Sequence, residues 1–218
     1  MVRTRMASDL WRISDQYRGA PLDPADCDPD PIVQFRAWFQ LAHAAGLPKV
    51  NAMTLATVDE RGRPHARIVL LKDADEHGFV FFTNYDSDKG KQLTASPYAA
   101  LVIYWDPLDR QVRIEGRVER VTAAESDAYF ATRPIGSQLG AIASPQSQPI
   151  PTRKLLEDRV AELSAELGDE PPARPANWGG FRVVPDLVEL WQGQPSRLHD
   201  RVRYRRSGEH WLRERLAP

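Results

Sequence analysis

Between residues 52 and 121 the chain alternates short apolar segments with turns rich in glycine, proline and aspartate. Segments of this length with many β-branched and aromatic residues are typical of strands. Turns as short as 59–64 and 106–109 connect consecutive strands only when the strands run antiparallel. We therefore expect an antiparallel sheet whose first three strands form a meander. Its predicted strands are 53–58, 66–72, 79–83, 98–105 and 111–121.

Helix signals separate these strands from one another and from a second group of strands. Asp30 is an N-cap for a helix that ends at Gly46. Ser87 caps a second helix, and Thr122 with Glu125 forms a capping box for a third. The remaining predicted elements are helices starting at 136–137 and spanning 152–167, a loop at 168–176, and strands at 180–184, 187–191, 201–206 and 210–216.

Strands dominate this order, and the helices fall between them irregularly. The simplest packing is an antiparallel β-barrel with peripheral helices, a mainly β member of the α+β class. Residues 1–30 are polar, with prolines at positions 21, 24 and 29, and we interpret them as a flexible N-terminal arm. Residues 31–218 then form a single domain.

The composition excludes several classes of function. The 29 Lys and Arg against 30 Asp and Glu give a net charge of −1, so no overall field favours nucleic acid or acidic membranes. Cys27 has no second cysteine to pair with, and the five histidines lack the spacing of metal ligands. The sequence shows no secretory signal, membrane-spanning run, glycine-rich dinucleotide motif or P-loop. We expect a cytoplasmic protein whose anion chemistry comes from local clusters.

A first candidate phosphate site combines Thr83 with the predicted helix start at Ser87. The free N–H groups of a helix start, with Lys89 beside them, suit a bound phosphate. Asp88 in the same turn would repel one. The alternative interpretation is that Ser87 only caps the helix.

A second candidate phosphate site lies on the third predicted helix. Tyr129 and Arg133 are i, i+4 neighbours on one face, and Ser137 follows in the next turn. Two hydroxyl groups and a guanidinium form a site of phosphate size. The alternative is an exposed Tyr–Arg pair. Gln146 and Ser147 follow in a polar turn that is either part of a site or ordinary loop.

Arg67 and Lys72 bracket an apolar strand. Because their separation is odd, a regular strand would point them to opposite faces. A shared ligand then requires a bulge, a strong twist or a subunit boundary. The alternative is a core strand whose two ends reach solvent.

Near the C-terminus, Arg197 and His199 lie two residues apart, so an extended backbone would project them from one face. With Trp191 close by, this pair suits a planar, anionic ligand. A solvated edge strand is the alternative. Two separate anion sites with aromatic and amide residues between them imply two phosphorylated partners, a cofactor and a substrate.

The chain resembles the pyridoxamine/pyridoxine 5′-phosphate oxidase family from about residue 30 to its end. The resemblance rests on many matches in the same order and not on one motif. It implies an FMN-binding split β-barrel that forms a homodimer with FMN at the subunit interface. The matching segments are 52–58, 67–72, 81–84, 110–111, 133–140, 143–147, 178–182, 190–193, 197–201 and 215–218.

The resemblance also implies roles for individual residues. Arg197 and His199 would lie at the pyridine ring and act in catalysis. FMN would be bound by Arg67, Ile68, Val69, Leu70, Leu71, Lys72, Phe82, Thr83, Asp88, Lys89, Gln111, Gln146, Ser147, Trp191 and Arg201. The substrate would be bound by Tyr17, Lys72, Tyr129, Arg133, Ser137, Arg197 and His199.

The implied reaction is oxidation of pyridoxamine or pyridoxine 5′-phosphate by O₂ to pyridoxal 5′-phosphate and H₂O₂, in vitamin B6 biosynthesis and salvage. Some positions depart from the family pattern. Phe82 replaces a tyrosine, Asp88 a basic residue and Ile142 a tryptophan, and no basic residue lies just before Tyr17. A phenazine-type oxidase of another reduced aromatic compound and a non-catalytic flavin- or pyridoxal-phosphate-binding protein are the alternatives.

Overall fold

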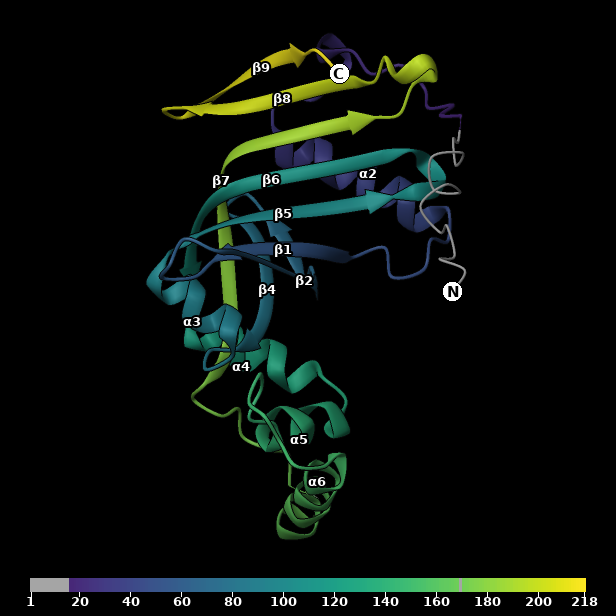
Figure 1. Cartoon of the computed structure of the whole chain (residues 1–218). Coiled ribbons are helices and arrows are strands. Elements are labelled where there is room, and N and C mark those ends of the chain that lie inside the picture. Colours follow the sequence, from purple (N-terminus) through teal and green to yellow (C-terminus); the bar gives the residue numbers. More distant parts are fainter. Residues whose placement is uncertain (1–15, 169) are drawn as a thin grey trace, which may run out of the picture.

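The computed structural model describes residues 16–168 and 170–218. Across these residues the strands form one antiparallel, nine-stranded sheet that curls into a half-barrel (Figure 1). Its order is β2-β1-β5-β6-β7-β4-β3, and β8 and β9 extend it beyond β7. The strands are β1 (Ala52–Val58), β2 (Pro64–Leu70), β3 (Asp73–Asp75), β4 (Gly78–Asn84), β5 (Tyr98–Trp105), β6 (Arg110–Arg120), β7 (Trp178–Gln192), β8 (Asp200–Ser207) and β9 (His210–Leu216). The predicted class, a mainly β split barrel with peripheral helices, is confirmed.

Strands β2 and β3 lie at opposite ends of the strand order, yet only two residues connect them. The sheet must therefore curl to bring its two ends together. Between them the backbone breaks at two residues: Leu71 N–H donates to the Asn51 carbonyl at 2.8 Å, and Lys72 N–H donates to the Val80 carbonyl at 2.8 Å. The predicted hairpin of β1 and β2 is confirmed, since the two strands pair antiparallel along their whole length. The second pairing of the predicted meander is wrong, since β4 pairs with β3 and β7 and not with β2.

The long strand β7 replaces two strands predicted at 180–184 and 187–191. A register shift between Glu115 and Gly116 of β6 places Pro185 opposite Gly116 and leaves Asp186 as the extra residue of a bulge. A bulge accommodates a proline that cannot donate a ladder hydrogen bond. Strand β7 therefore bends at this point without ending. Both of its halves pair with β6 along one edge, and along the other edge the first half pairs with β4 and the second with β8.

Most predicted helix boundaries hold. Asp30 and Ser87 cap their helices, and Thr122 and Glu125 form the expected capping box. The short helix expected to start near Gly136 follows Pro134 directly and is nine residues long. The α-helices are α2 (Pro31–Ala44), α3 (Asp88–Ala95), α4 (Ala123–Thr132), α5 (Ile135–Ala143) and α6 (Arg153–Leu167). Short 3₁₀ turns cover Pro24–Asp26, Asp106–Leu108 and Pro195–Arg197.

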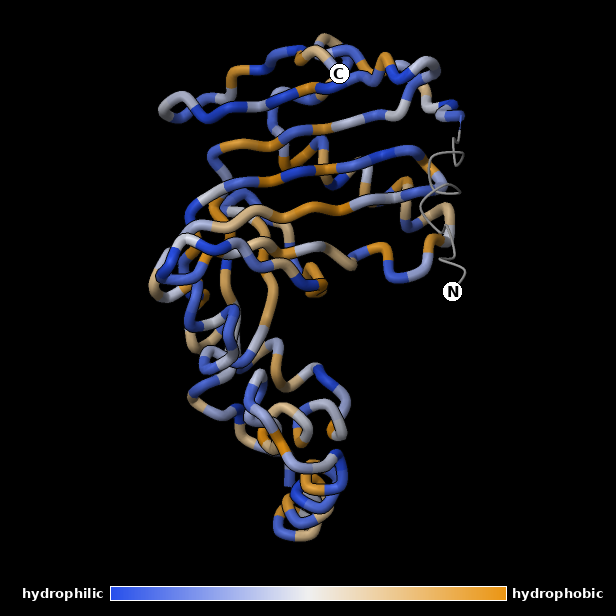
Figure 2. Tube along the Cα trace, in the orientation of Figure 1, coloured by the Kyte–Doolittle hydropathy of each residue, from blue (hydrophilic) through white to orange (hydrophobic). Residues whose placement is uncertain are grey.

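The core lies between the inner face of the sheet and α2, which crosses behind β5 and β6 (Figure 1). Phe35 of α2 meets Phe79 edge-to-face at 5.0 Å and stacks on Trp105 at 6.2 Å. Along strands such as β1, β5 and β6, buried residues alternate with more exposed ones (Figure 2), whereas β4 is buried on both faces. Helices α4, α5 and α6 form a lobe beside the barrel.

Part of the predicted N-terminal arm lies against the barrel. Gly19 N–H donates to the Gly193 carbonyl at 3.2 Å, and Cys27 is buried in the core. The prediction of flexibility for residues 1–15 lies outside the described residues. No helix among the described residues is long and apolar enough to span a membrane.

Candidate active site

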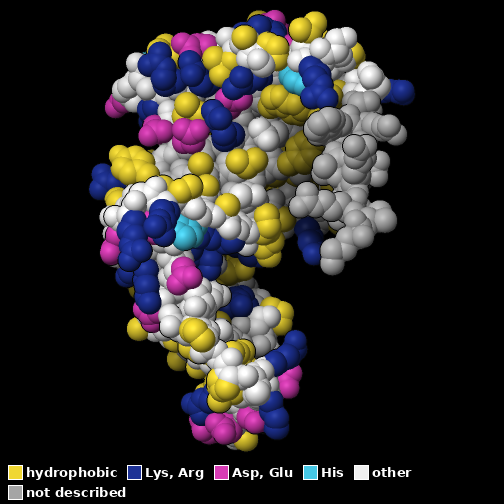
Figure 3. Space-filling view, viewed as in Figure 1, with side chains coloured by type: hydrophobic (Ala, Val, Ile, Leu, Met, Phe, Trp, Pro, Cys, Tyr) yellow, Lys and Arg dark blue, Asp and Glu magenta, His cyan; other side chains and the backbone are white. Residues whose placement is uncertain are grey.

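A cavity of about 640 Å³ lies between β2, β4, α4 and α5. In this region the surface is hollowed between the sheet and the helical lobe, and Lys and Arg side chains border the hollow (Figure 3). The cavity has no Asp or Glu among its described lining residues. Those residues are Ile68, Val69, Leu70, Lys72, Phe82, Thr83, Lys89, Tyr129, Thr132, Arg133, Pro134, Ser137, Gln146 and Trp178.

One wall of the cavity is an aromatic stack. The Phe82 ring stacks on Tyr129 at 4.0 Å and on Trp178 at 5.6 Å. Arg133 extends over Trp178, with its guanidinium carbon 4.7 Å from the ring centre, and Lys72 Nζ lies 5.5 Å from the Tyr129 ring. Tyr129 and Arg133, neighbours on the helix as predicted, thus lie close to Lys72, which follows β2 in the chain.

Arg133 is prepared for an anion that the protein itself does not supply. Its Nη1 atom is buried and has no hydrogen-bond partner among the described residues. Burial also lowers the pKa of the guanidinium. Because an unpaired buried donor is costly, a bound anionic oxygen at this position would stabilise the site.

The opposite wall holds a second polar group. Lys89 Nζ donates to Gln146 Oε1 at 2.9 Å and to Thr83 Oγ1 at 3.3 Å. Burial, followed by the charge of Arg67, lowers the pKa of Lys89. Ser87 caps α3 through Gly90 N–H, as the simple capping interpretation requires. The Thr83–Lys89–Gln146 group therefore combines a hydroxyl from β4, an ammonium from α3 and an amide from the loop after α5.

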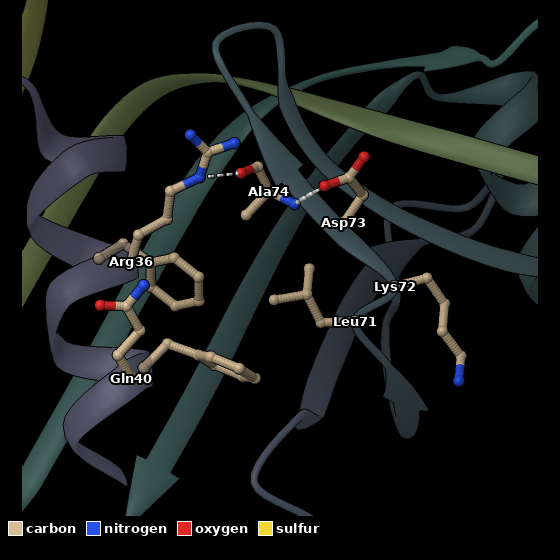
Figure 4. Close-up of a pocket in the computed structure, with 8 residues that line it drawn as sticks. Arg36, Gln40, Leu71, Lys72, Asp73 and Ala74 are labelled. Carbon is tan, nitrogen blue, oxygen red and sulfur yellow. Dashed lines mark hydrogen bonds between the residues drawn. The ribbon is translucent and has the colours of Figure 1, made fainter. Parts of the chain in front are cut away.

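Lys72 borders two pockets, and its direction decides between them. The smaller pocket, of about 300 Å³, lies between α2 and the start of β3 and includes Arg36 and Gln40. Figure 4 shows the Lys72 amino group directed away from Arg36 and Gln40. Lys72 is therefore assigned to the larger cavity. The predicted conflict with Arg67 disappears, because β2 ends at Leu70 and the regular alternation stops there.

Some predicted cofactor residues lie outside the larger cavity. Arg67 donates to Thr57 Oγ1 at 2.5 Å and to Gln92 Oε1 at 2.9 Å. Asp88 borders a neighbouring surface pocket, and Leu71 is buried in the core. The structure therefore brings Arg67 to the α3 side of the cavity without making it part of the lining.

A second cluster surrounds the turn between β7 and β8. The rings of Trp191 and His199 lie 4.6 Å apart, and Tyr17 contacts both edge-to-face at 5.5 and 5.0 Å. Burial, followed by the charge of Arg197, lowers the pKa of His199. Predicted substrate residues from the two ends of the chain thus meet here.

Three predicted FMN residues form a row across neighbouring strands of this cluster. Gln111 of β6 is opposite Trp191 of β7, which is opposite Arg201 of β8. The buried Glu189 carboxylate accepts hydrogen bonds from Arg201 Nε at 2.8 Å and from Arg113 at 2.9 Å. Glu189 therefore orients the Arg201 guanidinium at the outer face of the sheet.

The two clusters lie toward opposite ends of β7. Trp178 in the cavity is the first residue of this strand, whereas Trp191 in the second cluster lies close to its end. A strand of 15 residues extends over about 45 Å when straight. The predicted substrate residues of this chain therefore fall into two separate groups, one toward each end of β7.

Sequence reasoning missed several residues of these clusters. Trp178 was visible only as the first residue of a matching segment, and nothing marked it as a stacking partner of Phe82. Thr57 and Gln92 had no signal, because they reach Arg67 from β1 and α3 through tertiary contacts. The buried Glu189 lies in the strand predicted at 187–191, and nothing in the sequence marked its carboxylate as a partner of Arg201.

The cavity fits a ligand that carries both a phosphate and a flat ring. Its volume lies within the range of small-molecule sites and exceeds that of a lone phosphate. Lys72, Lys89 and Arg133 supply positive charge, and Arg133 Nη1 supplies an unused donor. Fold and site together define a split-barrel protein that binds phosphorylated ring compounds.

Comparison with known proteins specifies the family. Residues 39–166 match the family described as pyridoxamine 5′-phosphate oxidase, and residues 178–218 match the pyridoxine 5′-phosphate oxidase C-terminal dimerisation region. The chain belongs to the pyridoxamine 5′-phosphate oxidase family.

Named relatives are similar over nearly their whole length. A pyridoxine/pyridoxamine 5′-phosphate oxidase of Paraburkholderia phytofirmans is 57% identical, covering 97% of this chain and 100% of the relative. One of Burkholderia thailandensis is 59% identical, covering 96% and 99%. The crystal structure of PhzG from Burkholderia lata, in complex with tetrahydrophenazine-1-carboxylic acid, is 30% identical with a TM-score of 0.88, covering 94% of this chain and 100% of PhzG.

Proposed function

We propose that this protein is an FMN-dependent oxidase that converts pyridoxamine 5′-phosphate and pyridoxine 5′-phosphate to pyridoxal 5′-phosphate, with O₂ as oxidant and H₂O₂ as product. The observation that carries the proposal is the cavity lined by Lys72, Lys89 and Arg133, without a described carboxylate and with an unpaired Arg133 donor. The relatives named as this oxidase, at 57% and 59% identity, support it.

The substrate phosphate is assigned to one wall of the cavity. Lys72 and Arg133 supply charge, and Tyr129 and Ser137 supply hydroxyl donors. These groups leave little freedom to the phosphate, so the reacting carbon is held in one orientation. The aromatic stack of Phe82, Tyr129 and Trp178 is continuous with this wall and excludes water from it.

The residues that would hold FMN come from both clusters. Arg67, Thr83, Lys89 and Gln146, with Ser147 next to Gln146 in the chain, suit the cofactor phosphate. Residues 68–70 of β2, with Lys72 and Phe82, form the adjoining wall. Gln111, Trp191 and Arg201 form the row on the outer sheet face and suit the ring system. FMN supplies the acceptor for the hydride that leaves the substrate.

Arg197 and His199 are assigned to the pyridine ring of the substrate, with Tyr17 closing over them. Arg197 is a permanent cation that stabilises negative charge developing on the ring. His199 is held between Tyr17 and Trp191 and offers a ring nitrogen as a hydrogen-bond donor. These groups orient the ring and exclude water.

The working form is a homodimer, as the match of residues 178–218 to a dimerisation region indicates. We infer that each site combines the cavity of one protomer with the β7–β8 cluster of the other. The exposed apolar side chains of β2, led by Ile68 at 65% exposure, lie beside the cavity and provide surface for this contact.

An absorption spectrum and an oxygen electrode test the proposal. The purified protein is expected to show a flavin spectrum, and adding pyridoxamine 5′-phosphate under air should consume O₂ and form pyridoxal 5′-phosphate with H₂O₂. Bound FMN without turnover of either phosphorylated vitamer would refute the oxidase assignment and favour a binding protein.

The similarity to PhzG supports a second candidate, oxidation of a reduced tricyclic aromatic compound. The two candidates differ in their need for a phosphate site. Turnover of a reduced phenazine carboxylic acid that does not depend on Arg133 would favour this second function. Phosphate-dependent turnover of the vitamers would favour the first.

A further inference from the structure

The turn that carries Arg197 has an unfavourable backbone conformation. Ser196 and Arg197 both adopt left-handed conformations, with φ angles of 57° and 60°. Residues other than glycine rarely do so, and they persist there when surrounding contacts hold them. Inside the turn, Leu198 N–H donates to the Pro195 carbonyl at 3.2 Å. The contacts at the two ends of the turn therefore decide its geometry.

Gln194 makes those contacts. Its backbone N–H donates to His199 Nδ1 at 3.1 Å and so closes the turn across its base. Its side-chain amide donates to Asp200 Oδ2 at 2.9 Å and to the Ala20 carbonyl at 3.0 Å. Gln194 thus joins the two ends of the turn to each other and to the N-terminal segment.

The N-terminal segment lies close against the same turn. Leu22 N–H donates to Asp200 Oδ2 at 3.0 Å, the oxygen that Gln194 also uses. A Cβ atom on Gly19 would lie 2.0 Å from Gln192 Nε2, and one on Gly193 would lie 2.6 Å from the Tyr17 ring. Two glycines therefore permit the approach that brings Ala20 within reach of Gln194.

The hydrogen bond from the Gln194 backbone N–H also selects the tautomer of His199. Because Nδ1 accepts a hydrogen bond, the neutral ring carries its proton on Nε2. The ring is held between Tyr17 and Trp191. His199 therefore presents Nε2–H, a donor, toward any ligand in the cluster.

We propose that Gln194 is a positioning residue, whose side-chain amide holds Arg197 and His199 in their working orientation by bridging Ala20 and Asp200. The identity of the ring that the two residues meet rests on the proposed function, whereas the bridge itself does not. Both amide hydrogens are required, one for each acceptor. Glutamate has the same shape but neither hydrogen, and leucine has a similar size without polarity.

The test compares Gln194→Glu and Gln194→Leu with wild type, all as FMN-loaded protein labelled with ¹⁵N-histidine. Gln40→Leu, the same substitution at an exposed position of α2, is the matched control. Long-range ¹H–¹⁵N spectra report the tautomer of His199, and His199→Asn assigns its signals. Wild type and the control should show the Nε2–H form. The two variants should show a mixture, because without the side-chain bridge the Gln194 backbone N–H is no longer held in line with His199 Nδ1.

In steady-state kinetics with pyridoxine 5′-phosphate, both variants should lose about tenfold in kcat/KM, the effect of losing two hydrogen bonds. FMN affinity should stay unchanged, because Gln194 acts on the residues of the substrate ring. An unchanged tautomer and unchanged kcat/KM in both folded variants would overturn the proposal. A shifted tautomer in a protein that turns over neither vitamer would sustain the positioning role and refute the proposed function instead.

Discussion

At the scale of single residues, the candidate site is marked by Arg133, whose buried Nη1 atom has no hydrogen-bond partner in the described part of the chain. Lys89 lies half-buried beside the charge of Arg67 and donates to Thr83 and Gln146. Arg201, by contrast, is paired with the Glu189 carboxylate. Arg133 thus has an unmet donor that a bound anion would satisfy, whereas the charge of Arg201 is already balanced.

Arg133→Ala should raise KM for pyridoxine 5′-phosphate by about a hundredfold, because the substrate phosphate loses charge-assisted hydrogen bonds. FMN content should be retained. Steady-state kinetics check this, with Arg153→Ala, whose side chain is 90% exposed on α6, as control. An equal loss with unphosphorylated pyridoxine would contradict the phosphate assignment.

His199 should titrate below its usual value of 6.5, because burial and the charge of Arg197 both disfavour its protonated form and lower its pKa. The ring is then neutral at pH 7. Arg197→Gln removes one of these causes, so the midpoint should move upward. An NMR titration of the His199 signals measures both midpoints, and coincident midpoints would show that Arg197 does not act on the ring.

At the scale of elements, helix α4, which carries Tyr129 and ends beside Arg133, is held by an ion network around the buried Arg182. Arg182 of β7 is 7% exposed and pairs with Asp75 of β3 and, at 3.0 Å, with Glu125 of α4. Burial favours a raised pKa for Asp75, but the hydrogen bonds from Arg182 and the His77 backbone, together with the charge of Arg182, outweigh it and the pKa is lowered. The network fixes α4, and with it Tyr129 and Arg133, against the barrel.

Arg182→Met should destabilise the protein by about 1 kcal/mol, because the partly exposed Asp75 and Glu125 carboxylates lose their shared ion-pair partner. Thermal unfolding measures the loss, and Arg205→Met, at a half-exposed pair, is the control. The lowered pKa of Asp75 means that its stabilisation is present above its usual value of 3.8 and is lost as the pH falls through the folded value. Wild type should therefore lose its advantage over the variant in acid.

At the scale of the whole molecule, the proposed sharing of each site between two protomers follows from the separation of its two clusters along β7. Arg133 lines the cavity near the start of this strand, whereas Arg197 lies in the turn after its end. The match to a dimerisation region agrees with this division.

Arg133→Ala and Arg197→Ala dimers should each have little activity at substrate concentrations well below the raised KM. Mixing them, after dissociation and reassociation, should restore activity at that concentration to about a quarter of wild type. Random pairing gives half heterodimers, each with one intact site and one doubly altered site. Activity that stays at the level of the parent dimers would show that both residues serve the same protomer's site.

Much of the architecture followed from local pattern. Caps such as Ser87 and the Thr122–Glu125 box act within a single turn of helix, so their boundaries were predictable. The pairing of β4 with β7 was not, because strands β5 and β6 and helices α3 to α6 lie between them in the chain. The continuity of β7 through Pro185 was missed for a related reason, since the bulge depends on the register with β6.

By itself, the sequence determined the class of fold, the residues able to bind anions and the family, because these depend on local periodicity, residue chemistry and ordered motifs. Tertiary structure alone decided how they are grouped. It gathered Lys72, Arg133 and Lys89 around one cavity, moved Arg67 to its side, and placed Arg197 and His199 toward the far end of β7 beside Tyr17. The physical reason is that these groupings arise from long-range strand pairing and sheet curvature, which no local pattern encodes.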